Sequence, residues 1–87
     1  MELNMKVREI LDTIYCYKSC SFCKEGEETE SISGVTFIDV SRAERLYPDD
    51  AERYENFAVL TKLHEILEKE YVSMSLMFDE KIEIIYK

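Results

Sequence analysis

The stretch from Asp49 to Tyr71 constrains the fold most, because it is the one long amphipathic segment of the chain. At the helical repeat of about 3.6 residues per turn, its apolar side chains gather on one side: Val59, Leu60, Leu63, Ile66, Leu67 and Tyr71. Glu52 and Asn56 would interrupt this apolar stripe, so we expect a regular helix only from Phe57 onward. Such a helix needs an apolar surface to cover, and the rest of the chain offers candidate strands.

The first half of the chain predicts a short helix followed by a hairpin. Apolar residues at helical spacing mark the helix after Lys6: Val7, Ile10, Leu11 and Ile14. The range Tyr15–Lys24 alternates as a strand does, with Cys16, Cys20 and Phe22 on one face and Tyr15, Tyr17 and Cys23 on the other. The polar loop Glu25–Glu30 then leads to a returning strand, Ser31–Val40, with Gly34 as a possible bulge.

The second half predicts helical structure and another hairpin. Ser41 followed by Glu44 is a capping-box pattern, so a short helical turn should begin there and end before Pro48. Two alternating segments, Tyr71–Phe78 and Lys81–Tyr86, flank a tight Asp79-Glu80 turn. The prediction is therefore one α+β domain over residues 1–87, ordered helix–hairpin–helix–hairpin, with helices packed on one face of an antiparallel sheet.

Charge is concentrated in one continuous third of the chain. Of a net charge of −8, residues 25–55 carry −7, from ten acidic and three basic side chains. Such a segment repels nucleic acid and anionic membranes and attracts basic surfaces. We therefore expect no direct binding of DNA or RNA and no membrane association. With no long apolar run and no signal-like start, a cytoplasmic protein is expected.

Three cysteines, Cys16, Cys20 and Cys23, form the sharpest local pattern. The segment CYKSCSFC resembles the cluster loop of radical S-adenosylmethionine enzymes, in which three cysteines hold an iron–sulfur cluster. That family builds a much larger barrel and glycine-rich cofactor elements, which 87 residues with two glycines do not supply. A metal site with His64 as fourth ligand is a second interpretation, and a redox module a third. Cysteines acting as small apolar core residues are the favoured one.

Catalytic motifs are otherwise missing from the sequence. The single histidine lies forty-one positions from the nearest cysteine, and the two isolated glycines match no phosphate-binding loop. We therefore predict that the protein is not an enzyme and uses no cofactor.

Tyrosines accompany the acidic third, and tyrosine beside carboxylates is typical of protein-binding surfaces. The candidate binding residues combine both kinds of side chain: Glu25, Glu27, Glu28, Glu30, Tyr47, Asp49, Asp50, Glu52, Tyr54 and Glu55. The alternative is that the rings complete the core or a homodimer face, and the carboxylates only keep the protein soluble.

The opening MKVREILDTI, the closing DEKIEIIYK and the acidic middle EGEETE…YPDDAERYE resemble small proteins of phages and other mobile elements of low-GC bacteria. Among these are anti-CRISPR inhibitors, many of them small acidic domains. The resemblance implies a stoichiometric nucleic-acid mimic in a bacterial host cell, whose partner is a basic nucleic-acid-binding protein such as a CRISPR effector. The alternatives are the metal or redox module and a homo-oligomeric structural protein whose exposed apolar sheet face pairs with itself.

Overall fold

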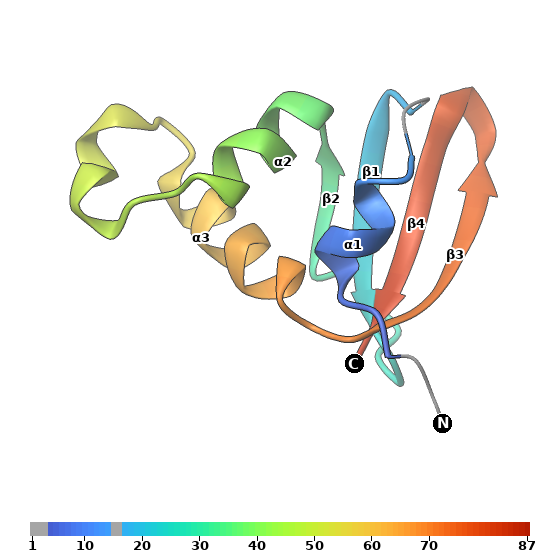
Figure 1. The fold of residues 1–87 in the computed structure, drawn as a ribbon. Helices are drawn as coiled ribbons and strands as arrows, with labels where there is room; N and C mark the ends of the chain where they lie inside the picture. The colour runs from blue at the N-terminus through green and yellow to red at the C-terminus, as the bar shows by residue number, and fades with distance from the viewer. Residues whose placement is uncertain (1–3, 15–16) are drawn as a thin grey trace.

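Residues 4–14 and 17–87 are described by a computed structural model, in which helices pack against a four-stranded sheet (Figure 1). The elements follow in this order: α1 (Val7–Leu11), β1 (Ser19–Lys24), β2 (Ile32–Val35), α2 (Phe37–Glu44), the 3-10 helix η1 (Pro48–Arg53), α3 (Phe57–Leu67), β3 (Tyr71–Met77), the 3-10 turn η2 (Phe78–Glu80) and β4 (Lys81–Tyr86). The predicted α+β class is confirmed, and β1 with β2 and β3 with β4 each form an antiparallel pair. None of the helices in the described ranges is both long and apolar enough to cross a membrane.

The sheet is mixed, and the prediction of an antiparallel sheet is wrong for its central pair. The strand order is β2-β1-β4-β3. Each hairpin is antiparallel, whereas β1 and β4 run parallel from Ser19 opposite Lys81 to Lys24 opposite Tyr86. The central strands β1 and β4 carry most of the buried residues of the sheet, whereas β2 contributes Val35. Their relative direction depends on the connection through α2 and α3, which residue alternation does not encode.

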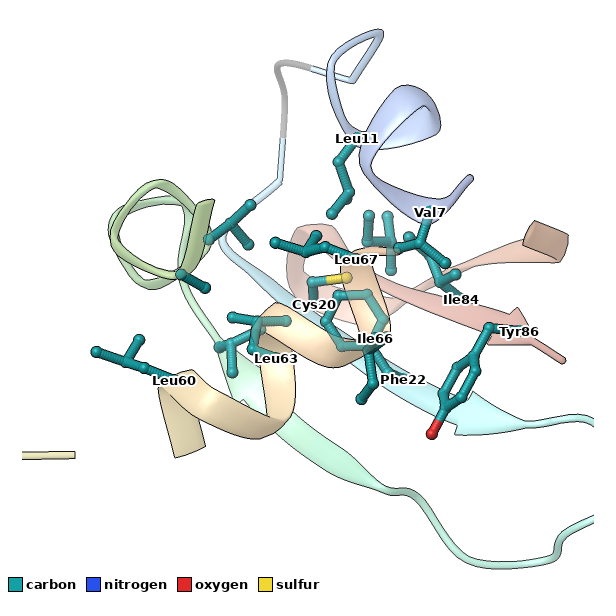
Figure 2. Packing of buried hydrophobic residues seen from close by; sticks show 14 residues of the cluster. Val7, Leu11, Cys20, Phe22, Leu60, Leu63, Ile66, Leu67, Ile84 and Tyr86 are labelled. Atoms are coloured by element: carbon teal, nitrogen blue, oxygen red, sulfur yellow. The ribbon is translucent and has the colours of Figure 1, made fainter. Parts of the chain in front are cut away.

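The core lies between the helices and one face of the sheet (Figure 2). Alternate residues of the central strands point into it, and α1, α2 and α3 cover them from the same side, as predicted. The buried side chains are Val7, Leu11, Cys20, Phe22, Val35, Val40, Ala43, Leu60, Leu63, Ile66, Leu67, Ile82, Ile84 and Tyr86. The opposite face of the sheet carries no helix in the described part of the chain.

The predicted strand Ser31–Val40 and the predicted helix start at Ser41 are both wrong. Strand β2 ends at Val35, and α2 begins at Phe37. The Thr36 hydroxyl accepts the backbone N–H of Asp39 (3.2 Å), and the Asp39 carboxylate accepts the backbone N–H of Thr36 (2.9 Å). This capping box begins the helix five residues early. Val40 and Ala43, three residues apart, lie on the buried face of α2.

The long helix is shorter than its amphipathic pattern suggests. It begins at Phe57, as expected, but ends at Leu67, and Tyr71 is the first residue of β3. The preceding segment forms η1, not a first helical turn. Val59, predicted on the buried side, is 40% exposed because α3 packs through Leu60 and Leu63.

The first hairpin differs from its prediction at the start and contains the predicted bulge. Strand β1 begins at Ser19, so Tyr17 precedes it, and its ring packs against the core instead of sharing the face of Cys23. Residues Tyr15 and Cys16 lie outside the described residues. The pairing between β1 and β2 shifts register near Gly34, whose φ of +69° is readily available only to glycine.

The loop between β3 and β4 holds two residues in the left-handed region, Asp79 (φ 60°) and Glu80 (φ 58°). Because a Cβ makes this conformation costly, Glu80→Gly should raise the free energy of unfolding by about 1 kcal/mol. Chemical denaturation measures this change. The matched control is Glu65→Gly in α3, where the same substitution should lower stability by about 1 kcal/mol. A loss of stability in both variants would contradict the prediction.

Candidate protein-binding surfaces

The loop between β1 and β2 presents four carboxylates from six consecutive residues. Glu25, Glu27, Glu28 and Glu30 are all exposed, and within the described residues none of them forms an ion pair. We call residues 25–30 the acidic loop. Its only nearby cation in sequence is Lys24, so the loop concentrates negative charge at one end of the hairpin.

The acidic loop is fastened to the sheet at both ends. The backbone N–H of Glu25 donates to the Tyr86 carbonyl (2.7 Å), and that of Ser31 donates to the Phe22 carbonyl (2.8 Å). A hydrogen bond of 2.6 Å also joins the hydroxyls of Ser31 and Tyr86. Within the loop, Gly26 adopts φ +87° and so allows the tight turn. These contacts fix the backbone of the loop from which the four glutamate side chains project.

Cys23 lies beneath the acidic loop. Its thiol donates to the Glu27 carbonyl (3.3 Å), and the Thr29 carbonyl lies 3.6 Å from the same sulfur. Burial raises the pKa of this thiol, and the negative charges of Glu83, Glu27 and Glu30 raise the pKa further. Glu83 therefore adds negative charge beside the acidic loop, on the open face of the sheet. Because Glu83 comes from β4, residues 25–30 by themselves do not indicate it.

The second acidic segment, residues 47–55, protrudes beyond α2 and α3, and we call it the arm. Tyr47 is 65% exposed, Asp49, Glu52 and Glu55 are exposed, and Tyr54 is half-buried against the core. Asp50 lies within η1. Tyr54, Glu55 and Asn56 line a hollow of about 550 Å³ together with Arg42 and Arg53. Arg42 and Arg53 offset part of the arm's negative charge beside this hollow.

The structure does not bring the two acidic segments together. Figure 1 shows the arm at one end of the molecule and the acidic loop at another, beside the C-terminus. The predicted binding residues thus divide into four in the acidic loop and six in the arm. Both predicted tyrosine anchors belong to the arm, and only Tyr47 is well exposed.

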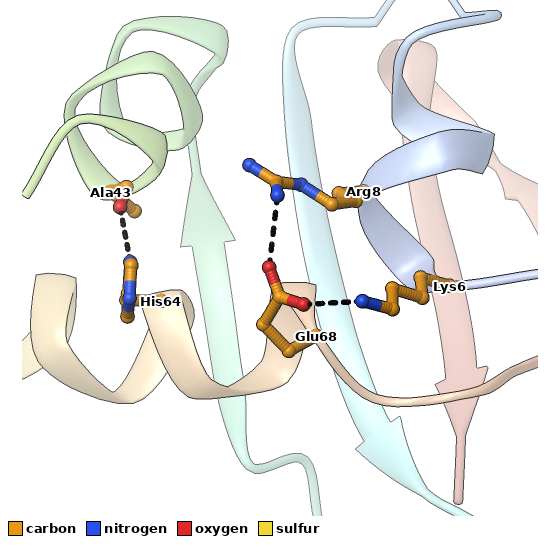
Figure 3. Close-up of polar contacts among 5 residues, drawn as sticks. All are labelled: Lys6, Arg8, Ala43, His64 and Glu68. Atoms are coloured by element: carbon orange, nitrogen blue, oxygen red, sulfur yellow. Dashed lines mark hydrogen bonds and ion pairs between the residues drawn. The ribbon is translucent and has the colours of Figure 1, made fainter.

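The candidate metal residues are also separated. The Cys20 side chain lies in the core beside Phe22 (Figure 2), and burial raises its pKa from 9.0 to about 12. His64 donates from Nδ1 to the Ala43 carbonyl (2.7 Å), which ties α3 to α2 (Figure 3). Among residues 4–14 and 17–87, no three His, Cys, Asp or Glu side chains are grouped as metal ligands would be. Cys16 lies outside the described residues.

Glu68, at the end of α3, joins that helix to the N-terminal segment. Its carboxylate accepts from Lys6 Nζ (2.8 Å) and pairs with Arg8 (3.0 Å), as Figure 3 shows. The hydrogen bond from Lys6 and the nearby positive charges lower the pKa of Glu68. These pairs are exposed, so they orient α1 more than they stabilise it.

The outer part of β3 is an exposed apolar surface. Met74 and Leu76 lie opposite Ile84 and Ile82, on the face that the helices cover. Even so, Leu76 is 80% exposed, and Phe78 just after the strand is 92% exposed. Figure 1 shows that α1 lies over β1 and β4 and leaves β3 uncovered. Strand order decides this exposure, so alternation alone could not reveal it.

Comparison with protein-family models, with curated proteins and with solved structures gives no match to this chain.

Proposed function

We propose that this domain binds a basic protein surface and thereby keeps nucleic acid away from it. The acidic loop carries the proposal, because it holds four exposed carboxylates in a fastened turn with Glu83 close by. A partner that binds phosphates presents lysines and arginines spaced for successive negative charges. Because the loop backbone is already fastened, it loses little backbone entropy when its carboxylates bind such a surface.

In this proposal the domain works stoichiometrically, with no covalent step and no cofactor. The partner is a basic nucleic-acid-binding protein of the bacterial cytoplasm, and a CRISPR effector is one protein of this kind. Complementary charge accelerates association and sets orientation. Because the acidic loop is more uniformly negative than the arm, it makes the main contact, and the exposed Tyr47 of the arm belongs to a secondary contact.

The direct test is affinity capture from a nuclease-treated lysate of a low-GC bacterium, with washes of rising salt and mass spectrometry of the retained proteins. We expect a basic nucleic-acid-binding protein that is lost as salt rises and that added duplex DNA or RNA displaces. A retained partner that nucleic acid does not displace would overturn the proposal.

Charge reversal separates the two acidic segments. The triple variant Glu25→Lys, Glu27→Lys and Glu28→Lys should weaken binding to the captured partner at least about tenfold, measured by calorimetry. The matched control makes the same change of charge in the arm, with Asp49→Lys, Asp50→Lys and Glu52→Lys, and should weaken binding less. Equal melting temperatures would show that both variants are folded. Wild-type affinity in the loop variant would overturn the assignment of the main contact to the acidic loop.

A further inference from the structure

We propose that a second copy of this chain pairs with the free edge of β3, in antiparallel register about Ser75, to form a continuous eight-stranded sheet. This inference goes beyond the proposed function, because it concerns a different surface. It rests on the backbone groups that β3 leaves unpaired, on its lack of charge, and on its symmetry about Ser75.

The backbone contacts show which groups of β3 face outward. The Tyr86 carbonyl accepts a hydrogen bond from the backbone N–H of Glu25, the residue that follows β1. The backbone N–H of Lys87 donates to the carbonyl of Glu70, the residue that precedes β3. In β4, even-numbered residues therefore face β1 and odd-numbered residues face β3. These odd-numbered residues of β4 lie opposite Ser73, Ser75 and Met77, whose backbone N–H and carbonyl groups therefore point toward β4. The N–H and carbonyl groups of Met74 and Leu76 consequently point outward.

No segment of the described chain pairs with β3 on this outer side beyond its first residue. The N-terminal segment covers only the start, where Tyr71 donates to the Met5 carbonyl (2.7 Å) and Val7 donates to the Lys69 carbonyl (2.9 Å). Exposed strand edges normally carry charges, proline or bulges that prevent pairing. The other edge, β2, is short and interrupted at Gly34. Strand β3 has one register shift near Tyr71 and is regular from Ser73 onward.

Charge favours this edge as the contact between two copies. Each chain carries −8, so two copies repel one another over most of their surface. The sequence YVSMSLM of β3 contains no charged residue. Two acidic molecules can therefore approach most closely along this strand, whereas a basic partner finds no charge there to recognise.

The regular part of β3 is also self-complementary. A two-fold axis makes residue i of one copy face residue j of the other, and j face i. With the axis at Ser75, Met74 of each copy lies opposite Leu76 of the other, and the two Ser75 residues face one another. The outward groups of Met74 and Leu76 then exchange four backbone hydrogen bonds. Their side chains extend the apolar layer formed by Ile82 and Ile84.

The chain exposes more surface than an average folded monomer of its mass. A folded monomer of 10.3 kDa exposes about 5,400 Å² on average, and this chain exposes 6283 Å². A stable interface covers about 800 Å² on each partner. Of the nine large hydrophobic side chains that are exposed among the described residues, five lie in β3 or at the adjoining Phe78.

The first test is the molar mass of the full chain by sedimentation equilibrium over a range of concentrations. We expect a dimer whose dissociation constant falls as salt rises, because salt screens the repulsion between the two acidic copies. Binding of a basic partner has the opposite salt dependence, so failure of one proposal is distinguishable from failure of the other. A monomer at all concentrations and salt levels would overturn this inference.

Two substitutions locate the contact. Leu76→Lys should raise the dissociation constant at least about tenfold, and since Leu76 is 80% exposed, the domain should keep its melting temperature. Ile38→Lys is the matched control on α2, at an apolar residue that is 59% exposed, and should leave the dimer unchanged. A dimer that weakens equally in both variants, or in neither, would overturn the assignment to β3.

A cross-link tests the register. Facing residues without mutual backbone bonds have Cα atoms about 4.5 Å apart, within the range that a disulfide spans. Ser75→Cys should therefore give a covalent dimer under mild oxidation, well above the background of the unmodified chain. Ser33→Cys, an exposed serine on the opposite edge of the sheet, is the control. Equal cross-linking through both positions would overturn the register.

Discussion

Replacing Phe22 with alanine should lower the free energy of unfolding by about 3–5 kcal/mol, the largest effect that we expect from a single substitution. Phe22 is fully buried at the centre of β1, and its ring lies beneath α3 in Figure 2. Alanine would remove its apolar contacts and leave a cavity that the surrounding strands can fill only in part. Since small domains are stable by about 5–15 kcal/mol, this loss removes a large fraction of the total stability.

Urea denaturation at neutral pH measures this loss, and the neighbouring residue supplies the control. Ser21 lies on the open face of the same strand, so Ser21→Ala should change stability by less than about 0.5 kcal/mol. The Phe22 carbonyl also receives the hydrogen bond that fastens one end of the acidic loop. A cost below about 1 kcal/mol for Phe22→Ala would contradict the position of this ring in the core.

Stability should also fall steeply at alkaline pH, because the Cys20 thiol is buried. Burial raises its pKa from 9.0 to about 12, so the folded state retains a proton that the unfolded state releases above pH 9. The contribution of the protonated Cys20 thiol to the free energy of unfolding is complete below pH 9 and is lost progressively as pH rises toward 12. The free energy of unfolding should therefore fall by about 2 kcal/mol between pH 8 and pH 10.5.

Urea titrations at several pH values, in the presence of reductant, test this prediction. Cys20→Ala should start from a lower stability at pH 8 and lose about 2 kcal/mol less than the wild-type chain over the same range. Tyr17, whose pKa burial raises to about 12, adds a change of the same sign in both proteins. If the free energy of unfolding depends equally on pH with and without the Cys20 thiol, the alkaline loss of stability does not come from Cys20.

Residue periodicity predicted most of the core. The helical spacing of Leu60, Leu63, Ile66 and Leu67 and the alternation of Ile82, Ile84 and Tyr86 identify buried positions correctly. The predictions failed where two local signals competed. Phe37, Ile38 and Val40 suit a strand by composition, but the capping box of Thr36 and Asp39 makes them helical. The pattern of these two side chains was present in the sequence and could have located the start of α2.

The candidate binding residues show a different division. Composition and alternation predicted that residues 25–30 are a charged turn between two strands. They did not predict that this turn lies apart from the arm, because the distance between two loops depends on the packing of every element between them. Likewise Glu83 joins the acidic loop only through the pairing of β4 with β1.

The sequence by itself therefore determined the local features: which residues alternate, where apolar faces lie, and which segments are acidic. Each of these depends on backbone geometry within a few residues. Only the tertiary structure decided that β1 and β4 are parallel neighbours, that β3 is an uncovered edge, and that the acidic third forms two separate surfaces. These outcomes depend on contacts between residues far apart in the chain, and the packing of the helices on the central strands selects among the possible arrangements.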